Sequence, residues 1–266
     1  MNLNAITWNV NPELFSLGPL HVRWYGLTWA LGIWITLMIT QRIFKNEKLP
    51  EAWLDKLFMY TVIGTIVGAR LGHCLFYGWD HYSANPIEIL YIWQGGLASH
   101  GGAIGIAVAI FLFNKKVSKK GYIWVLDRLL VGVTLCAASI RFGNLMNSEI
   151  YGTATTLPWG FNFPVDSQWD GAAHHPTQLY EMLAYISVFV LTSWLYWKKD
   201  AYKIPGLITG VFLVGMFGAR FLLEFIKLDQ EAFESGMLLN MGQILSIPFM
   251  AWGVWLLLNT RKTVKA

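Results

Sequence analysis

Seven apolar runs of about twenty residues, separated by short polar segments, constrain the fold of this 266-residue chain more than any other feature. A helix rises 1.5 Å per residue, so each run is long enough to cross about 30 Å of hydrocarbon. We therefore predict an all-α polytopic membrane protein with about seven transmembrane helices. The candidate spans are Val22–Phe44, Leu54–Tyr77, Gly95–Phe113, Tyr122–Arg141, Thr177–Trp197, Pro205–Ile226 and Leu239–Leu258.

The composition supports this fold class. Only 14% of the residues are charged, whereas about a quarter are charged in a typical soluble domain. The 14 tryptophans and 11 tyrosines suit the aromatic belts of a membrane protein. The net charge of +4 comes from short basic clusters between apolar runs, so it does not indicate nucleic-acid binding.

The distribution of lysine and arginine predicts the orientation. If the N-terminus is outside, fourteen basic residues face inward, whereas only Arg23 and Lys227 face outward. This asymmetry is what the positive-inside rule requires, and it supports an odd number of spans with a cytoplasmic C-terminus. The inward-facing residues are Arg42, Lys45, Lys48, Lys56, Lys115, Lys116, Lys119, Lys120, Lys198, Lys199, Lys203, Arg261, Lys262 and Lys265.

We expect a single integral membrane domain, 1–266, with two external elaborations. Residues 78–94 are short and aromatic and are predicted to form an interfacial arm, and residues 142–176 to form a small head. Cys74 and Cys136 lie inside apolar runs and are expected to be packing residues, without a disulfide or cysteine metal site. The first twenty residues lack a basic region, so we expect no cleavable signal peptide.

The four remaining basic residues, Arg70, Arg128, Arg141 and Arg220, also lie within the spans, where charge is costly unless something requires it. Arg128 follows Asp127 near an inner helix end, where snorkelling or local pairing explains it. The other three, Arg70, Arg141 and Arg220, are predicted to converge at similar depth on the outer side.

Two explanations of this convergence remain open. The arginines either form ion pairs that hold the helices together or bind an anion. Few acids share their depth, chiefly Glu149, Glu181 and Glu224, with Glu224 one helical turn after Arg220. A bound anion therefore accounts better for the charge.

Polar residues are also concentrated in two other stretches. Arg141 to Gly152 contains two asparagines, Asn144 and Asn147, and a carboxylate, Glu149. Residues 95–105 place His100 among five glycines, which indicates either close helix packing with a satisfied histidine or a general base with backbone free to approach a substrate.

Two further motifs have both structural and functional interpretations. The pair His174-His175 precedes Pro176 and a predicted helix containing Glu181, and we expect these groups to cap the helix and orient the site. A zinc site is an alternative, but the HExxH pattern is absent, and we expect no metal and no cofactor. Tyr25 is either an interface anchor or a cavity-lining residue.

Motifs for covalent catalysis are missing. The sequence contains no GxSxG and no Walker-type loop. The residues instead favour electrostatic stabilisation of a phosphate by arginines, assisted by one base.

Taken together, these motifs resemble one family. The glycine-rich histidine stretch, the arginine–asparagine–glutamate stretch, His-Pro-Thr-Gln-Leu-Tyr-Glu from His175, the Arg220–Glu224 span and the stretch Met241–Pro248 are similar to the bacterial phosphatidylglycerol–prolipoprotein diacylglyceryl transferases. The resemblance runs from about Tyr25 to Pro248.

The resemblance implies an enzyme of the bacterial plasma (inner) membrane that needs no nucleophile of its own. It implies transfer of the diacylglyceryl group from phosphatidylglycerol to the lipobox cysteine of a preprolipoprotein, with release of glycerol 1-phosphate. By matched motif, His100 is the candidate base for the thiol. The alternative is that His100 only orients the substrate. Arg141, Asn144 and Arg220 are expected to hold the phosphate headgroup, with Arg70 secondary. The residues expected to shape or support the site are Tyr25, Asn147, Glu149, Gly152 and Glu224.

The chain departs from the family pattern at three places. Ile140 stands where the family has glycine, Leu145 where it has phenylalanine, and Met216 where some relatives have tyrosine. Two other functions remain as alternatives. A transporter or flippase of an anionic lipid also uses intramembrane arginines, but it predicts broken helices and repeated halves. An intramembrane scaffold does not explain so many polar groups at one depth.

Overall fold

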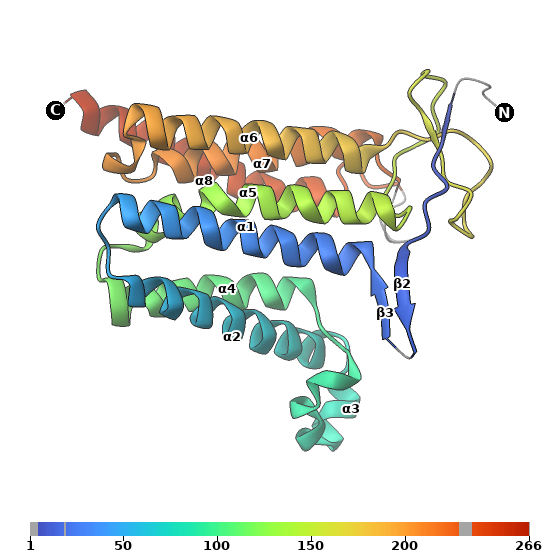
Figure 1. The fold of residues 1–266 in the computed structure, drawn as a ribbon, viewed down its shortest axis with the longest axis horizontal. Coiled ribbons are helices and arrows are strands. Elements are labelled where there is room, and N and C mark those ends of the chain that lie inside the picture. Colours follow the sequence, from blue (N-terminus) through green and yellow to red (C-terminus); the bar gives the residue numbers. More distant parts are fainter. Residues whose placement is uncertain (1–4, 19, 229–235, 266) are drawn as a thin grey trace. The chain divides into compact units, whose positions relative to one another are not determined.

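The computed structural model, which describes residues 5–18, 20–228 and 236–265, is mostly helical (Figure 1). It contains seven helices that are long and apolar enough to cross a membrane within these residues, which confirms the predicted polytopic all-α fold. Their bounds are α1 (Trp24–Asn46), α2 (Glu51–Phe76), α4 (Ser99–Phe113, continued by a π-helical turn at Asn114–Ser118), α5 (Tyr122–Met146), α6 (Thr177–Lys199), α7 (Leu207–Leu223) and α8 (Met241–Lys265).

The most informative difference from the predicted spans is the end of α5. We expected this helix to end at Arg141, but it continues for five more residues, so Arg141 lies inside it. The prediction was wrong because the polar residues that suggested an end find partners while remaining helical. Asn144, for example, bonds to Arg141 and Glu149 through its side chain.

A second difference is at the start of α4. The predicted span began at Gly95, but the helix begins at Ser99. Gly95 and Gly96 adopt φ values of 85° and 70°, a left-handed backbone that glycine tolerates and a right-handed helix excludes. The predicted Gly95 start therefore marks the turn that leads into α4.

The chain divides into two compact units, residues 1–39 with 126–266 and residues 40–125. The predicted single membrane domain stays a prediction. In the first unit, α7 packs against α6 and α8. Asp127 of α5 accepts hydrogen bonds at the start of α7 from the backbone N–H groups of Gly206 (2.7 Å) and Thr209 (2.8 Å) and from the Thr209 hydroxyl (2.7 Å).

The segment between α5 and α6 forms a small folded element with its own aromatic core. Tyr151 stacks on Phe163, with ring centroids 4.7 Å apart, and Leu145 and Phe161 complete the buried cluster. Four short strands, which the sequence did not predict, are also present among the described residues. β1 (Ile6–Thr7) pairs in parallel with β4 (Phe161–Asn162), and β2 (Glu13–Leu17) pairs antiparallel with β3 (Leu20–Arg23).

In the second unit, α2 and α4 lie side by side (Figure 1). Gly64, Gly68 and Gly72 of α2 face Gly101 and Gly105 of α4, and a Cβ on any of them would overlap the facing helix. Small residues four apart let two backbones approach this closely in a membrane helix pair. Close helix packing therefore accounts for Gly101 and Gly105 of the glycine-rich stretch.

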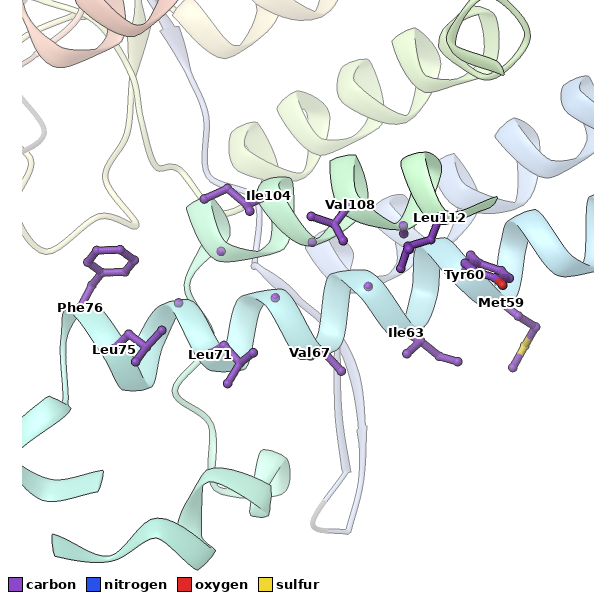
Figure 2. Close-up of a pocket in the computed structure, with 16 residues that line it drawn as sticks. Met59, Tyr60, Ile63, Val67, Leu71, Leu75, Phe76, Ile104, Val108 and Leu112 are labelled. Atoms are coloured by element: carbon purple, nitrogen blue, oxygen red, sulfur yellow. The ribbon is translucent and has the colours of Figure 1, made fainter. Parts of the chain in front are cut away.

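An apolar groove runs along the same helix pair (Figure 2). Its volume is about 580 Å³. Ile63, Val67 and Leu71 of α2 line it on one side, and Ile104 and Val108 of α4 on the other. These side chains suit hydrocarbon and carry no group for acid–base or phosphate chemistry.

The predicted arm follows α2 in the chain. It consists of α3 (Trp79–Ala84), η1 (Pro86–Leu90) and η2 (Ile92–Gln94), and several of its apolar side chains are exposed, among them Trp79 and Trp93. Exposed aromatic side chains on a short irregular segment are typical of an interfacial location, which stays a prediction for this arm.

Candidate functional site

Glu181 is the centre of a buried charged cluster in the first unit. Its side chain, on α6, is fully buried, and each carboxylate oxygen meets a different cation. Arg141 Nε of α5 lies 2.8 Å from Oε2, and Lys227 Nζ lies 2.9 Å from Oε1. Lys227 also lies 3.3 Å from the carboxylate of Glu224, which opens the 3-10 turn η5 (Glu224–Ile226) after α7. Two carboxylates and two cations thus tie three helices together.

Arg141 connects this cluster to the polar residues at the end of α5. Its Nη1 donates to Asn144 Oδ1 at 3.1 Å. The amides of Asn144 and Asn147 in turn donate to one oxygen of Glu149, at 2.8 and 3.2 Å. The sequence therefore correctly grouped these residues. The structure also shows that Arg141 has a protein carboxylate as a partner, so the helix-locking explanation applies at least in part to this arginine.

A strained turn holds Glu149 in place. Ser148 and Ile150, on either side of it, have positive φ values of 55° and 60°. A β-branched residue in this region costs of order 1–3 kcal/mol and persists only where its surroundings enforce it. Here the first turn of α6 does so, because Thr177 donates to the Ile150 carbonyl (2.9 Å) and Gln178 to the Glu149 carbonyl (2.6 Å).

Gly152 lies where the loop passes between the start of α6 and the end of α7. Its N–H donates to the His175 carbonyl at 2.8 Å, and the next N–H, of Thr153, donates to the Ile226 carbonyl at 2.8 Å. A Cβ at this position would overlap the Ile226 carbonyl oxygen and crowd Thr177. Glycine is therefore required by close approach, and the contact holds the segment that carries Lys227.

Arg220 differs from Arg141 in its partners. It lies on α7 one turn before Glu224, whose N–H donates to the Arg220 carbonyl. Its charge and that of Arg141 both act on the Tyr185 hydroxyl. In the part of the chain that the structure describes, the Arg220 guanidinium makes no hydrogen bond or ion pair, and it is only half-buried. Its donors are therefore not used by any described carboxylate.

Tyr25 lies next to the same cluster. It is the second residue of α1, and Gly143 of α5 packs against its ring, where an added Cβ would lie 2.9 Å from Cδ2. The charges of Glu149 and Arg141 act on its hydroxyl. Tyr25 thus lies near Arg141 and Glu149, and its role in lining the site stays a prediction.

Arg70 and His100 belong to the 40–125 unit, and their approach to the other arginines stays a prediction. The buried Arg70 guanidinium donates to the carbonyls of Ile89 (2.9 Å) and Gly95 (2.6 Å), and also to those of Glu88 and Gly96. It therefore anchors the arm to α2. His100 is the second residue of α4 and is exposed, and it forms no hydrogen bond with any described residue.

We expected the histidine pair before α6 to cap that helix, but its side chains do not do so. No side-chain cap bond is present, because His174 is directed into the loop and contacts the Gly152 carbonyl (2.7 Å) and Asp170 (2.8 Å). His175 contacts the Tyr180 hydroxyl, and its pKa is lowered by burial and by the His174 charge. Among the described residues, no group of three or more His, Cys, Asp or Glu side chains is arranged to hold a metal.

Sequence reasoning missed two members of the cluster. Lys227 was counted only as an outward-facing basic residue, and Tyr185 was not considered. The spacing offered a signal, since Glu224 and Lys227 are three apart and Glu181 and Tyr185 four apart, as in pairs on one helical face. Of the departures from the family pattern, Leu145 is buried under the loop and Met216 is buried on α7.

Comparison with known proteins places the chain among membrane transferases. Residues 12–259 match the model of the family described as prolipoprotein diacylglyceryl transferase. The phosphatidylglycerol–prolipoprotein diacylglyceryl transferase of Porphyromonas gingivalis is 49% identical, over 97% of this chain and 95% of that protein. The proteins of the same name from Chloroherpeton thalassium and Tolumonas auensis are each 44% identical, over 97% and 96% of this chain and 95% and 97% of their own length.

Proposed function

The chain belongs to the prolipoprotein diacylglyceryl transferase family, and on that premise we propose that it transfers the diacylglyceryl group of phosphatidylglycerol to the lipobox cysteine of a preprolipoprotein. The observation that carries this proposal is the family match over nearly the whole chain, joined to the buried pairing of Arg141 with Glu181 between two helices long enough to span a membrane. The reaction is the first step of lipoprotein maturation.

In the proposed reaction, the cysteine sulfur of the protein substrate attacks the terminal glycerol carbon of the diacylglyceryl group. A C–S bond forms, the C–O bond to the phosphate breaks, and the electron pair leaves with glycerol 1-phosphate. The thiol proton goes to a base, for which His100 is the candidate because imidazole titrates near neutral pH. The nucleophile comes from the substrate, so the chain needs none of its own.

The phosphate carries the negative charge that develops on the leaving group, and arginine is the side chain best suited to hold it. Arg220 is the main candidate, because its guanidinium is not taken by any carboxylate in the described residues. Arg141 is proposed to contribute while held in position by Glu181 and Asn144. Glu149 and Tyr25 would support these groups from the end of α5 and the start of α1.

We further propose that the protein is a multi-pass protein of the bacterial inner membrane, with the N-terminus outside and the C-terminus in the cytoplasm. The excess of basic residues in one set of loops supports this orientation. The charged cluster would then face the outer side, where the signal peptide of a preprolipoprotein presents its lipobox. The transporter alternative gains no support, because the relatives compared above are all named as transferases.

The test is incubation of the purified protein in phosphatidylglycerol vesicles with a lipobox peptide, followed by mass spectrometry. We expect one diacylglyceryl group to be added to the cysteine, and no addition to a peptide with serine in its place. Arg220→Ala should abolish the addition, whereas Arg23→Ala, which removes an exposed arginine of β3, should retain it. Unmodified peptide with the parent protein would refute the proposed function.

A further inference from the structure

We propose that Lys227 is a positioning residue that occupies Glu181 and Glu224, and thereby leaves Arg220 available for the lipid phosphate. This inference rests on the proposed function, because it concerns the group that holds the phosphate there. Nothing in the family resemblance assigned a role to Lys227, which is an outward-facing basic residue in the sequence alone.

Burial separates Lys227 from the cations that can meet a ligand. Its side chain is 1% exposed, whereas that of Arg141 is 14% exposed. Lys227 Nζ already lies 2.9 Å from Glu181 and 3.3 Å from Glu224. An ammonium enclosed between two carboxylates is not available to a lipid headgroup, so its role is in the charge balance of the protein.

The charge balance explains what Lys227 does. Glu181 and Glu224 are both buried, and a buried carboxylate needs a cation or hydrogen-bond donors to remain ionised. Arg141 supplies one cation, at the carboxylate oxygen of Glu181 that Lys227 does not contact. Without Lys227, Glu224 would lose its ion pair, which is the only one it forms with a described residue.

Arg220 is a candidate replacement on α7, the helix that Glu224 caps at its C-terminus. It precedes Glu224 by one turn, and their connection is helical, because the Glu224 N–H donates to the Arg220 carbonyl. Residues four apart on a helix lie on the same face and readily form ion pairs. A Glu224 that had lost Lys227 would therefore compete with the lipid phosphate for the Arg220 guanidinium.

The surroundings prevent Glu224 from avoiding this competition by turning away. Gly242 of α8 packs directly on its carboxylate, and an added Cβ there would lie 2.6 Å from the carboxyl carbon. The Lys227 backbone is also fixed, because it forms a bridge with Gly152 beside the contact of Thr153 with Ile226. The carboxylate and the ammonium are thus both held in place.

A double-substitution experiment tests this role. Binding of phosphatidylglycerol to the purified protein is measured by titration into detergent, for the parent protein, Lys227→Met, Lys227→Arg and the double variant Lys227→Met/Glu224→Gln. We expect Lys227→Met to weaken binding at least tenfold and Lys227→Arg to bind within threefold of the parent. The double variant should recover to within threefold, because the competing carboxylate is gone.

A merely structural role predicts the opposite for the double variant, since a second change in a buried cluster would add to the damage. The proposal is overturned if Lys227→Met binds as the parent does, or if the double variant binds more than threefold more weakly than the parent. If Lys227→Met does not fold, the double variant alone decides by the same threshold. Because binding is measured without the peptide, the result is independent of whether the chain transfers the diacylglyceryl group.

Discussion

Replacing Gly152 with alanine should disturb the charged cluster without changing any charge. The added Cβ would lie 2.7 Å from the Thr177 methyl carbon and 2.9 Å from His175 Cβ, and would overlap the Ile226 carbonyl oxygen. None of these atoms is the far end of a flexible side chain, so the backbone must move. Overpacking of this kind costs about 1–3 kcal/mol, which changes the folding equilibrium by about 5- to 150-fold.

The displacement should reach the site through two backbone contacts. Thr153 N–H donates to the Ile226 carbonyl, and Gly152 forms a bridge with Lys227. If residues 226 and 227 move, the ammonium between Glu181 and Glu224 moves with them. A misplacement of about 1 Å is sufficient to cost roughly a hundredfold in rate. We therefore expect Gly152→Ala to lower kcat/KM by about ten- to a hundredfold.

Gly218→Ala is the matched control. Gly218 lies inside α7, and an added Cβ would meet no atom within 4 Å. Alanine in a helix interior is about 0.5–1 kcal/mol more favourable than glycine, so this variant should melt at the same temperature or higher and keep its rate. Transfer to the lipobox peptide and thermal unfolding in detergent are measured for both variants. Equal rates and equal melting temperatures in the two variants would refute the close-approach argument.

Three further changes have defined outcomes. Burial and the hydrogen bond to Asp166 raise the pKa of Tyr151. The contribution of Tyr151 to stability is therefore full below about pH 10 and is lost as the pH rises further. In thermal unfolding, Tyr151→Phe should remove this loss of stability at alkaline pH. The hydrogen bond with His174 lowers the pKa of Asp170. The contribution of Asp170 to stability is therefore full above about pH 4 and is lost at lower pH. Asp170→Asn should make the melting temperature depend less on pH in the acid range. Arg141→Lys keeps the charge but loses the guanidinium fork, and we expect transfer to the peptide to fall at least tenfold; an unchanged rate would show that charge alone suffices.

The spans were predictable because a helix that crosses the hydrocarbon must consist of about twenty mostly apolar residues in sequence, and such a run is visible in the local composition. Each run from α1 to α8 that we predicted contains a helix, and most ends agree within a few residues. The end of α5 was not predictable from composition, because the partner of Arg141 is Glu181, forty residues later on α6. A charged residue that is paired with a residue distant in sequence can lie inside a helix, and the local sequence pattern does not show such a pairing.

The site was predictable in part for the same reason. Arg141 and Asn144 are one helical turn apart on α5, and the tight turn after the helix brings Glu149 back to Asn144. The contact of Lys227 with Glu181 joins residues 46 positions apart, and only the packing of α6 against α7 creates it. The short strands were missed because two-residue pairings such as Ile6 with Phe161 leave no periodic pattern.

Simultaneous measurement of both products tests the central claim most directly. Phosphorus-31 NMR monitors the release of glycerol 1-phosphate, and mass spectrometry monitors formation of the thioether. We expect one glycerol 1-phosphate for each diacylglyceryl group that reaches the peptide cysteine, and neither product with Arg220→Ala. Full release of glycerol 1-phosphate by Arg220→Ala, or lipidated peptide without that release, would contradict phosphate binding by the intramembrane arginine as the basis of the reaction.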